Sequence, residues 1–301
     1  MLKTLLKPAY RFAHDVLYRS GQLRTAWGAR YEGQPILQGH ISDEHLGDPR
    51  LDDQLCRDFA AAGITVSDYR IDAGAYAHYL KEARYPAGYY GGGVDPKQNF
   101  TEKTLEHYVS TQFMDLGPDS VFVDIAACSS PFHQIVRARY GVAQSYQQDL
   151  IFPPGRHGDR IGGYGHELDL PDGSVDAVTL HCSLEHFEGD TDTRFFQRLE
   201  RLLRPGGRAI VLPFYIAHRY TIHIDPAYNL LKGHRPQLDP LAQLRYCDWY
   251  QFFSRHYDLA ALQRRILSQA PGLRLYLYRV TNFREVYAGS YLRFVGVFER
   301  V

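Results

Sequence analysis

The 301-residue chain has few cysteines, no net charge and no long apolar run. Its cysteines, Cys56, Cys128, Cys182 and Cys247, lie far apart without a CxxC pair, which argues against a disulfide framework and a structural zinc site. The 34 basic residues are balanced by 34 acidic ones, which argues against a dedicated nucleic-acid binder. Without a run of about 18 apolar residues or the features of a signal peptide, the sequence predicts a cytoplasmic protein with no transmembrane segment.

Residues 1–98 have an irregular pattern, and we interpret them as a mainly helical accessory region. Leucines and aromatic residues among Lys3, Lys7 and Arg11 have the spacing of an amphipathic helix. Such a helix either packs on the main domain or contacts a membrane surface. Two further helices are predicted over 51–62 and 101–114.

A regular alternation of strands and helices begins near residue 117. The helix after the third predicted strand ends at the termination signal of residues 204–207, and Asp258 caps a later helix. The predicted strands are Val121–Ile125, Ala143–Gln148, Val175–Leu180, Ala209–Pro213, Leu273–Leu277 and Tyr291–Phe298. This order indicates an α/β fold with a doubly wound, mostly parallel sheet and an antiparallel last strand. In such a sheet the ligand crevice lies beyond the carboxyl ends of the strands.

Three segments carry a family resemblance: LPDGSVDAV (170–178), SLEH (183–186) and RFFQRLERLLRPGGRAIV (194–211). Together they resemble a class I S-adenosylmethionine-dependent methyltransferase, and the resemblance extends over residues 117–301. It implies a Rossmann-like sheet of seven strands in a domain spanning 99–301. The aromatic and histidine-rich segment at about 214–257 is interpreted as a lid inserted into that domain.

The first strand exit departs from the family pattern. A GxGxG loop is usual there, whereas this chain has small residues without a glycine, namely Ala126, Ala127, Cys128, Ser129 and Ser130. Alanine at a positive φ costs about 1 kcal/mol, so the loop weakens cofactor binding without preventing it. Ser130 and Pro131 are expected to begin the next helix and to direct backbone donors at a carboxylate.

The resemblance assigns cofactor contacts around the three strand exits. Asp124 is expected to organise the methionine end of S-adenosylmethionine. Asp149, followed by Leu150, is expected to accept hydrogen bonds from the ribose hydroxyls, although a turn-capping role is the alternative. The loop with His166, Glu167 and Leu168 is expected to line the adenine.

Four titratable residues are the catalytic candidates: His181, Glu185, His186 and His223. Methyl transfer to a hydroxyl needs an aligned acceptor and a group that removes its proton. His181 is the preferred base, because an imidazole titrates near neutrality. The Glu185–His186 pair also resembles the metal-binding pair of some RNA ribose methyltransferases, with His218 and His223 as further ligands, but we predict no metal.

The aromatic lid, together with a general similarity to methyltransferases of surface polysaccharide biosynthesis, favours a hydroxyl of a saccharide or other small molecule as acceptor. Two alternatives stay open: a natural product amine or phenol as acceptor, or a catalytically silent methyltransferase fold that serves as a binding or scaffold module. Tyr89 and Tyr90 are expected to close over the cofactor from the N-terminal side. The oligomeric state is left open.

Overall fold

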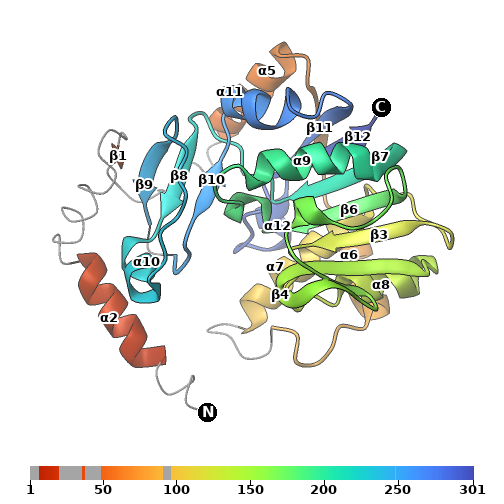
Figure 1. The fold of residues 1–301 in the computed structure, drawn as a ribbon, viewed down its shortest axis with the longest axis horizontal. Coiled ribbons are helices and arrows are strands. Elements are labelled where there is room, and N and C mark those ends of the chain that lie inside the picture. Colours follow the sequence, from red (N-terminus) through yellow and green to blue (C-terminus); the bar gives the residue numbers. More distant parts are fainter. Residues whose placement is uncertain (1–6, 20–35, 38–48, 91–95, 248) are drawn as a thin grey trace.

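The computed structural model describes residues 7–19, 36–37, 49–90, 96–247 and 249–301 (Figure 1). Within these residues, eight strands form the main sheet in the order β2-β11-β12-β7-β6-β3-β4-β5. Their bounds are β2 Thr65–Tyr69, β3 Val121–Ile125, β4 Gln144–His157, β5 Arg160–Gly162, β6 Val175–His181, β7 Leu203–Leu212, β11 Leu273–Val280 and β12 Phe294–Arg300. β12 runs antiparallel to both of its neighbours, β11 and β7, which confirms the predicted antiparallel last strand. The fold is the predicted α/β class.

The described sheet has one strand more than the predicted seven. The N-terminal strand β2 pairs in parallel with β11 at the edge of the sheet, from Thr65 beside Tyr276 to Tyr69 beside Val280. The side chains of β2 are exposed or half-buried, so its sequence lacks the apolar signal of a core strand. The segment before residue 98, predicted as an accessory region, therefore contributes one strand to the main sheet.

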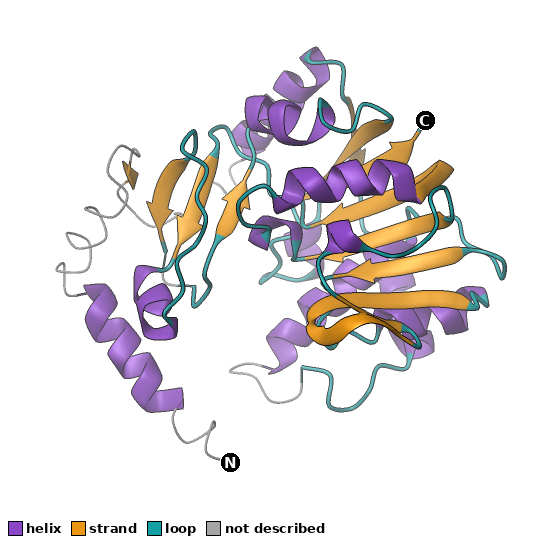
Figure 2. Cartoon of the chain, in the orientation of Figure 1, coloured by secondary structure: helices purple, strands orange, loops and turns teal. Residues whose placement is uncertain are grey.

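Helices cover both faces of the main sheet (Figure 2). One face packs against α6, α7 and α8, and the other packs against α5, α9 and α11. The bounds are α5 Pro49–Ala61, α6 Ala73–Ala83, α7 Pro96–Thr111, α8 Phe132–Tyr140, α9 Thr191–Leu202, α11 Leu259–Leu262 and α12 Phe283–Val286. β3 is buried throughout: Val121 and Val123 belong to the first of two core clusters and Phe122 to the second. The unbroken apolar run of β3 is therefore explained by burial on both faces.

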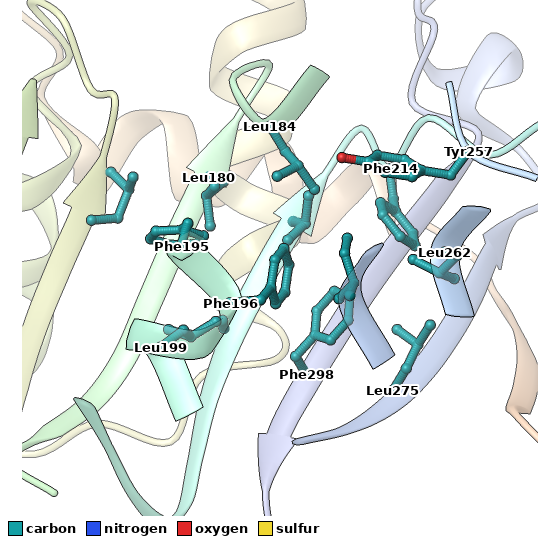
Figure 3. Close-up of a cluster of buried hydrophobic side chains, with 14 of the residues drawn as sticks. Leu180, Leu184, Phe195, Phe196, Leu199, Phe214, Tyr257, Leu262, Leu275 and Phe298 are labelled. Atoms are coloured by element: carbon teal, nitrogen blue, oxygen red, sulfur yellow. The ribbon is translucent and has the colours of Figure 1, made fainter. Parts of the chain in front are cut away.

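Helix α9 packs its apolar stripe onto the sheet (Figure 3). Phe195, Phe196 and Leu199 are completely buried, and the Phe196 ring contacts Phe298 of β12 with a centroid distance of 4.6 Å. The chain turns sharply after α9, where a Cβ on Gly207 would lie 2.9 Å from two backbone oxygens. The predicted termination signal thus ends the helix, although β7 begins at Leu203, earlier than predicted. Asp258 caps α11 as predicted, accepting from the Ala261 N–H at 2.8 Å.

Three strands of the predicted lid, β8, β9 and β10, form a second, smaller sheet with β1 of the N-terminal region, in the order β1-β9-β8-β10 among the described residues. Their bounds are β1 Ile36–Leu37, β8 Thr221–Ile224, β9 Gln243–Tyr246 and β10 Ser254–His256, and helix α10 (Pro226–Lys232) follows β8. The N-terminal helix α2 (Lys7–Arg19) packs on α10, where His14 Nε2 lies 2.7 Å from Asp225 Oδ2. Figure 1 shows α2, α10 and the small sheet together at one end of the molecule, beside the main sheet. The more N-terminal leucines of the predicted amphipathic helix lie outside the described residues.

Candidate active site

The exits of β3, β4 and β6 lie side by side, because β3 pairs in parallel with both of the other strands. Three cavities open along this edge. We call them the loop cavity, of about 260 Å³, beside residues 126–130; the β4 cavity, of about 410 Å³, beside the exit of β4; and the lid cavity, of about 610 Å³, beneath the small sheet. Ala126 lines the first two, and Lys103 and Cys182 line both the loop and the lid cavity. The three spaces are thus adjacent parts of one crevice, as predicted for the carboxyl edge.

The loop cavity contains a buried carboxylate with spare hydrogen-bonding capacity. Asp124 Oδ1 accepts from the Thr179 hydroxyl at 2.8 Å and lies 3.2 Å from His181 Nδ1. Among the described residues, Asp124 Oδ2 is buried and has no hydrogen-bond partner. A buried acceptor of this kind suits a cationic donor such as an ammonium group. The cavity is lined by Tyr89, Tyr90, Lys103, His107, Asp124, Ile125, Ala126, Ala127, Cys128, Ser130, His181 and Cys182.

The glycine-free loop adopts the conformation that glycine would favour. Ala126 and Cys128 each have a φ of 51°, in the left-handed region. Side chains of the β4 exit hold the loop: Asp149 Oδ2 accepts from the Cys128 N–H at 2.7 Å, and Gln148 Oε1 accepts from the Ala126 N–H at 3.1 Å. Hydrogen bonds from β4 therefore impose the strained conformation that the sequence predicts.

Replacing Cys128 by glycine is expected to raise the free energy of unfolding by roughly 0.5–1 kcal/mol, because glycine adopts a positive φ without steric cost. Ser129→Gly is the matched control in the same loop; Ser129 does not have a positive φ, so glycine there adds only chain entropy to the unfolded state and lowers stability. Urea denaturation of both variants measures the difference. Equal losses of stability would contradict this account of the loop.

The β4 cavity contains some, but not all, of the residues predicted to bind the cofactor. Asp149, Leu150 and His166 line it, and the His166 ring stacks on Tyr164 with a centroid distance of 5.2 Å. Other lining residues, missed from the sequence, are Gln148, Gly165, Phe187, Glu188, Thr191, His234, Arg235 and Gln237. Those at 234–237 come from the lid, more than 80 residues along the chain from Asp149, and no local pattern marks them.

Three predicted cofactor residues lie outside the lining of these cavities. Glu167 accepts from the Tyr164 N–H at 3.2 Å and so stabilises its own turn. Leu168 is buried in the core, and Ser129 lines none of the three cavities. Ser130 lies in the loop cavity, but helix α8 begins at Phe132, whose N–H donates to Ser130 Oγ at 3.2 Å. The helix therefore starts later than the sequence predicts.

The lid cavity brings together Glu185 and His186 from the exit of β6. The Glu185 side chain is only 5% exposed, and burial raises the pKa of its carboxyl. His186 Nε2 lies 3.6 Å from Glu185 Oε1, while its Nδ1 lies 2.6 Å from the Phe253 carbonyl of the lid. The cavity is also lined by Lys103, Cys182, Pro213, Phe214, Tyr215, Ile216, Ala217, Trp249, Gln251, Ser254, His256, Tyr291, Arg293 and Phe294.

The other two catalytic candidates lie elsewhere. His181 faces the loop cavity, where both ring nitrogens are within 3.2 Å of partners, Asp124 Oδ1 and Ser110 Oγ. His223 is buried in β8, with its Nε2 3.1 Å from Thr221 Oγ1, and lines none of the three cavities. Glu185 therefore lines the lid cavity, His186 lines both the lid cavity and the β4 cavity, His181 lines the loop cavity, and His223 lines none of the three.

The metal ligand set considered from the sequence is not assembled. His218 Nε2 lies 3.0 Å from the Leu51 carbonyl, away from the Glu185–His186 pair. In the described parts of the chain, no group of three or more His, Cys, Asp and Glu side chains is arranged to hold a metal ion.

A buried polar cluster lies where the loop cavity adjoins the lid cavity, and it was not predicted from the sequence. Lys103 Nζ donates to Glu106 Oε1 at 2.9 Å, and the Cys182 thiol donates to the same oxygen at 3.2 Å. Burial, followed by the charge of Glu106, raises the pKa of Cys182 well above its usual range, so the thiol stays neutral. Lys103 and Glu106 lie on α7, and only the long-range packing of that helix brings them to the crevice.

Comparison with known proteins identifies the class of this crevice. Residues 123–211, from β3 through β7, match the family described as "Methyltransferase domain". No curated protein matches the chain significantly. The chain is an enzyme that contains a methyltransferase domain, and its cofactor is S-adenosylmethionine. This confirms the predicted enzyme class and cofactor.

Two solved structures illustrate how distant the similar proteins are. The 1,6-didemethyltoxoflavin-N1-methyltransferase of Burkholderia thailandensis, with bound S-adenosylhomocysteine, is 17% identical with a TM-score of 0.44; the match covers 76% of this chain and 90% of that chain. The geranyl diphosphate C-methyltransferase of Streptomyces coelicolor is 14% identical with a TM-score of 0.40; the match covers 91% and 97%. Such distant similarities indicate no acceptor.

Proposed function

We propose that this enzyme transfers the methyl group of S-adenosylmethionine to a hydroxyl of a saccharide or a similar small molecule. The observation that carries the proposal is the lid cavity, in which the buried Glu185 carboxyl faces about 610 Å³ of space next to the loop cavity. Aromatic side chains alternate there with hydrogen-bonding ones such as Gln251, Ser254 and His256. Aromatic faces and polar groups together suit a sugar ring.

The residues of the other two cavities fit the cofactor. Asp124 Oδ2, which has no hydrogen-bond partner in the described part of the chain, would accept from the ammonium group of the cofactor, and Asp149 would accept from the ribose hydroxyls. The stacked Tyr164 and His166 would flank the adenine. Tyr89 and Tyr90 would close the loop cavity over the methionine end.

Glu185 is the proposed base. When bound, the cofactor supplies a methyl group on a positively charged sulfur. As the acceptor oxygen took up that methyl group, the Glu185 carboxylate would accept the hydroxyl proton. His186 would orient that carboxylate from the lid side, and His181 would act as a positioning residue by holding Asp124.

The proposal also includes a cellular compartment and a type of biosynthesis for the reaction. We place the reaction in the cytoplasm, in the biosynthesis of surface polysaccharides; the four cysteines are all free, as expected in a reducing compartment. Transfer of a labelled methyl group to a panel of saccharides, phenols and amines tests the acceptor class. Labelling of amines or phenols alone would replace the saccharide with the alternative acceptors.

Asp149→Ala is expected to weaken the binding of S-adenosylhomocysteine by about 10- to 100-fold. The substitution removes the acceptor for the Cys128 N–H at 2.7 Å and the Ile151 N–H at 3.0 Å, as well as the proposed contact with the ribose. Titration calorimetry measures the affinity. Asp159→Ala, which removes a carboxylate outside the three cavities, is the control and should leave the affinity unchanged. Unchanged affinity in Asp149→Ala, with a large loss of stability, would indicate a purely turn-capping role.

A further inference from the structure

Exposed apolar side chains gather where the N-terminal helix meets the small sheet. On α2, Phe12 is 72% exposed and Val16 is 49% exposed. We define the α2–α10 patch as Phe12, Val16, Leu230, Leu231, Trp249 and Tyr250, each at least 36% exposed. Figure 1 shows that α2 and α10 lie at the end of the molecule away from the main sheet. Exposed apolar residues concentrated in this way mark an interaction surface.

Within the described residues, helix α2 packs against α10 and Tyr250 through the side that carries Tyr10 and His14. Its Tyr10 contacts Tyr228 of α10, and His14 stacks on Tyr250 at a centroid distance of 4.0 Å. Phe12 and Val16 are four residues apart, so they share a face of the helix, and their positions are rotated away from His14. The helix thus attaches to the small sheet by one side and presents apolar side chains on the other.

The charge of the two helices favours an anionic partner. The sequences of α2 and α10 contain four basic residues, Lys7, Arg11, Arg19 and Lys232, and one acidic residue, Asp15. Lys232 Nζ lies 5.0 Å from the Tyr10 ring centroid, so one positive charge lies where the two helices meet. Basic residues beside exposed Phe, Leu, Trp and Tyr are the composition that binds the interface of an anionic bilayer.

The patch is continuous with the acceptor side of the crevice. Trp249 is 40% exposed in the patch and also lines the lid cavity. Its neighbour Tyr250 stacks on His14 of α2, so only a short segment separates the exposed helix from the wall of the cavity. In the described residues, no helix is long and apolar enough to cross a bilayer.

We propose that the α2–α10 patch binds the surface of an anionic lipid bilayer and thereby holds the lid cavity close to acceptors anchored at that surface. The positioning of the lid cavity near anchored acceptors rests on the proposed function, whereas the binding to the bilayer does not. The acceptor class that follows is an amphiphile, in which a polar group enters the cavity and an apolar chain stays in the lipid.

Sedimentation with vesicles tests the binding. The full chain is mixed with vesicles of phosphatidylcholine alone or of phosphatidylcholine with phosphatidylglycerol. We expect it to sediment with the anionic vesicles and to be released by salt. Phe12→Ser/Val16→Ser should lower the partition coefficient at least about tenfold, because two apolar side chains no longer enter the interface. Arg11→Glu/Lys232→Glu should abolish the preference for the anionic vesicles.

The control is Ile151→Ser/Val301→Ser, which removes two apolar side chains of similar exposure, 64% and 56%, outside the patch. This double variant should partition like the original chain. Binding of S-adenosylhomocysteine is measured for every variant. A variant that has lost vesicle binding but still binds S-adenosylhomocysteine is folded, and vesicle binding is thereby tested independently of the proposed function. Failure of the original chain to bind anionic vesicles overturns the proposal, as does equal loss in the control. A dimer that Phe12→Ser/Val16→Ser converts to a monomer, without vesicle binding, would assign the patch to a second copy of the chain.

Discussion

Glu185→Gln is expected to lower the turnover of methyl transfer by about 10²- to 10⁴-fold while leaving the affinity for S-adenosylhomocysteine unchanged. Glutamine keeps the size of the side chain and its hydrogen bonding, but it cannot take a proton. Glu185 lines the lid cavity and neither of the two cavities that fit the cofactor, so cofactor affinity should not respond.

The pH dependence gives this prediction a second readout. A base acts in its deprotonated form, and burial raises the pKa of Glu185 above the usual range of a glutamate. The rate should therefore be low at acidic pH and rise as the pH passes through that raised pKa. Glu185→Asp should retain part of the rate and a similar pH profile.

His181→Asn is the comparison that separates the two candidate bases. If His181 is a positioning residue, its loss frees Asp124 and weakens cofactor binding more than it slows turnover of the saturated enzyme. If His181→Asn instead loses turnover at normal affinity, and Glu185→Gln keeps it, the imidazole is the base.

Asp192→Ala is expected to lower the free energy of unfolding by about 3–5 kcal/mol, because it leaves buried positive charge without a partner. Asp192 and Arg255 are both completely buried, with Arg255 Nη1 2.6 Å from Asp192 Oδ2. Arg265 donates to the same carboxylate through Nη2 at 2.6 Å and Nε at 2.9 Å, and the Tyr257 hydroxyl donates at 2.7 Å. Since Arg255 lies on β10 and Asp192 on α9, the cluster joins the small sheet to the main domain.

The direction in which Asp192 makes the free energy of unfolding depend on pH follows from the shift of its pKa. Burial alone would raise the pKa of Asp192, but the hydrogen bonds from Arg265 and the charge of Arg255 outweigh it and lower the pKa. The stabilisation is therefore complete above the pKa of an unfolded aspartate and is lost as the pH falls through the lowered value. The substituted protein should lose this part of its acid sensitivity.

Asp190→Ala is the matched control for stability. Asp190 lies two residues away and is 62% exposed, with an ion pair to Arg194 one turn along the helix. Exposed pairs of this type contribute less than about 1 kcal/mol. Urea denaturation of both variants measures the contrast, and losses of equal size would show that the buried cluster does not anchor the lid.

The central sheet and the helix α9 were predictable because the spacing of their apolar residues indicates which side chains are buried. β3 is an unbroken apolar run, and the stripe of α9 has the helical period. The edge strand β2 was not predictable, because its half-exposed side chains follow no such pattern.

The site was predictable only where a residue's place in the chain determines its place in space. Asp124 lies near the end of β3, and Asp149 directly follows the part of β4 that pairs with β3, so both reach the crevice. His181 and Glu185 are close in sequence, but the turn between them places His181 at the loop cavity and Glu185 at the lid cavity. Their spacing in the sequence could not reveal this difference. Lys103 and Arg235 reach the crevice from distant elements, and His223 is drawn away by the small sheet, which the sequence did not reveal.

The edge strand β2 also determines which strand the main sheet presents to other molecules at this edge. Without β2, the backbone donors and acceptors of β11 would be unpaired along an entire edge, a template for strand addition between molecules. β2 occupies this edge and carries polar side chains in its place. Asp68 of β2 is held by Arg279 of β11 at 2.8 Å, and charge at a sheet edge discourages intermolecular pairing. The outer strand of the sheet at this edge is therefore short and charged, which disfavours strand addition from another molecule.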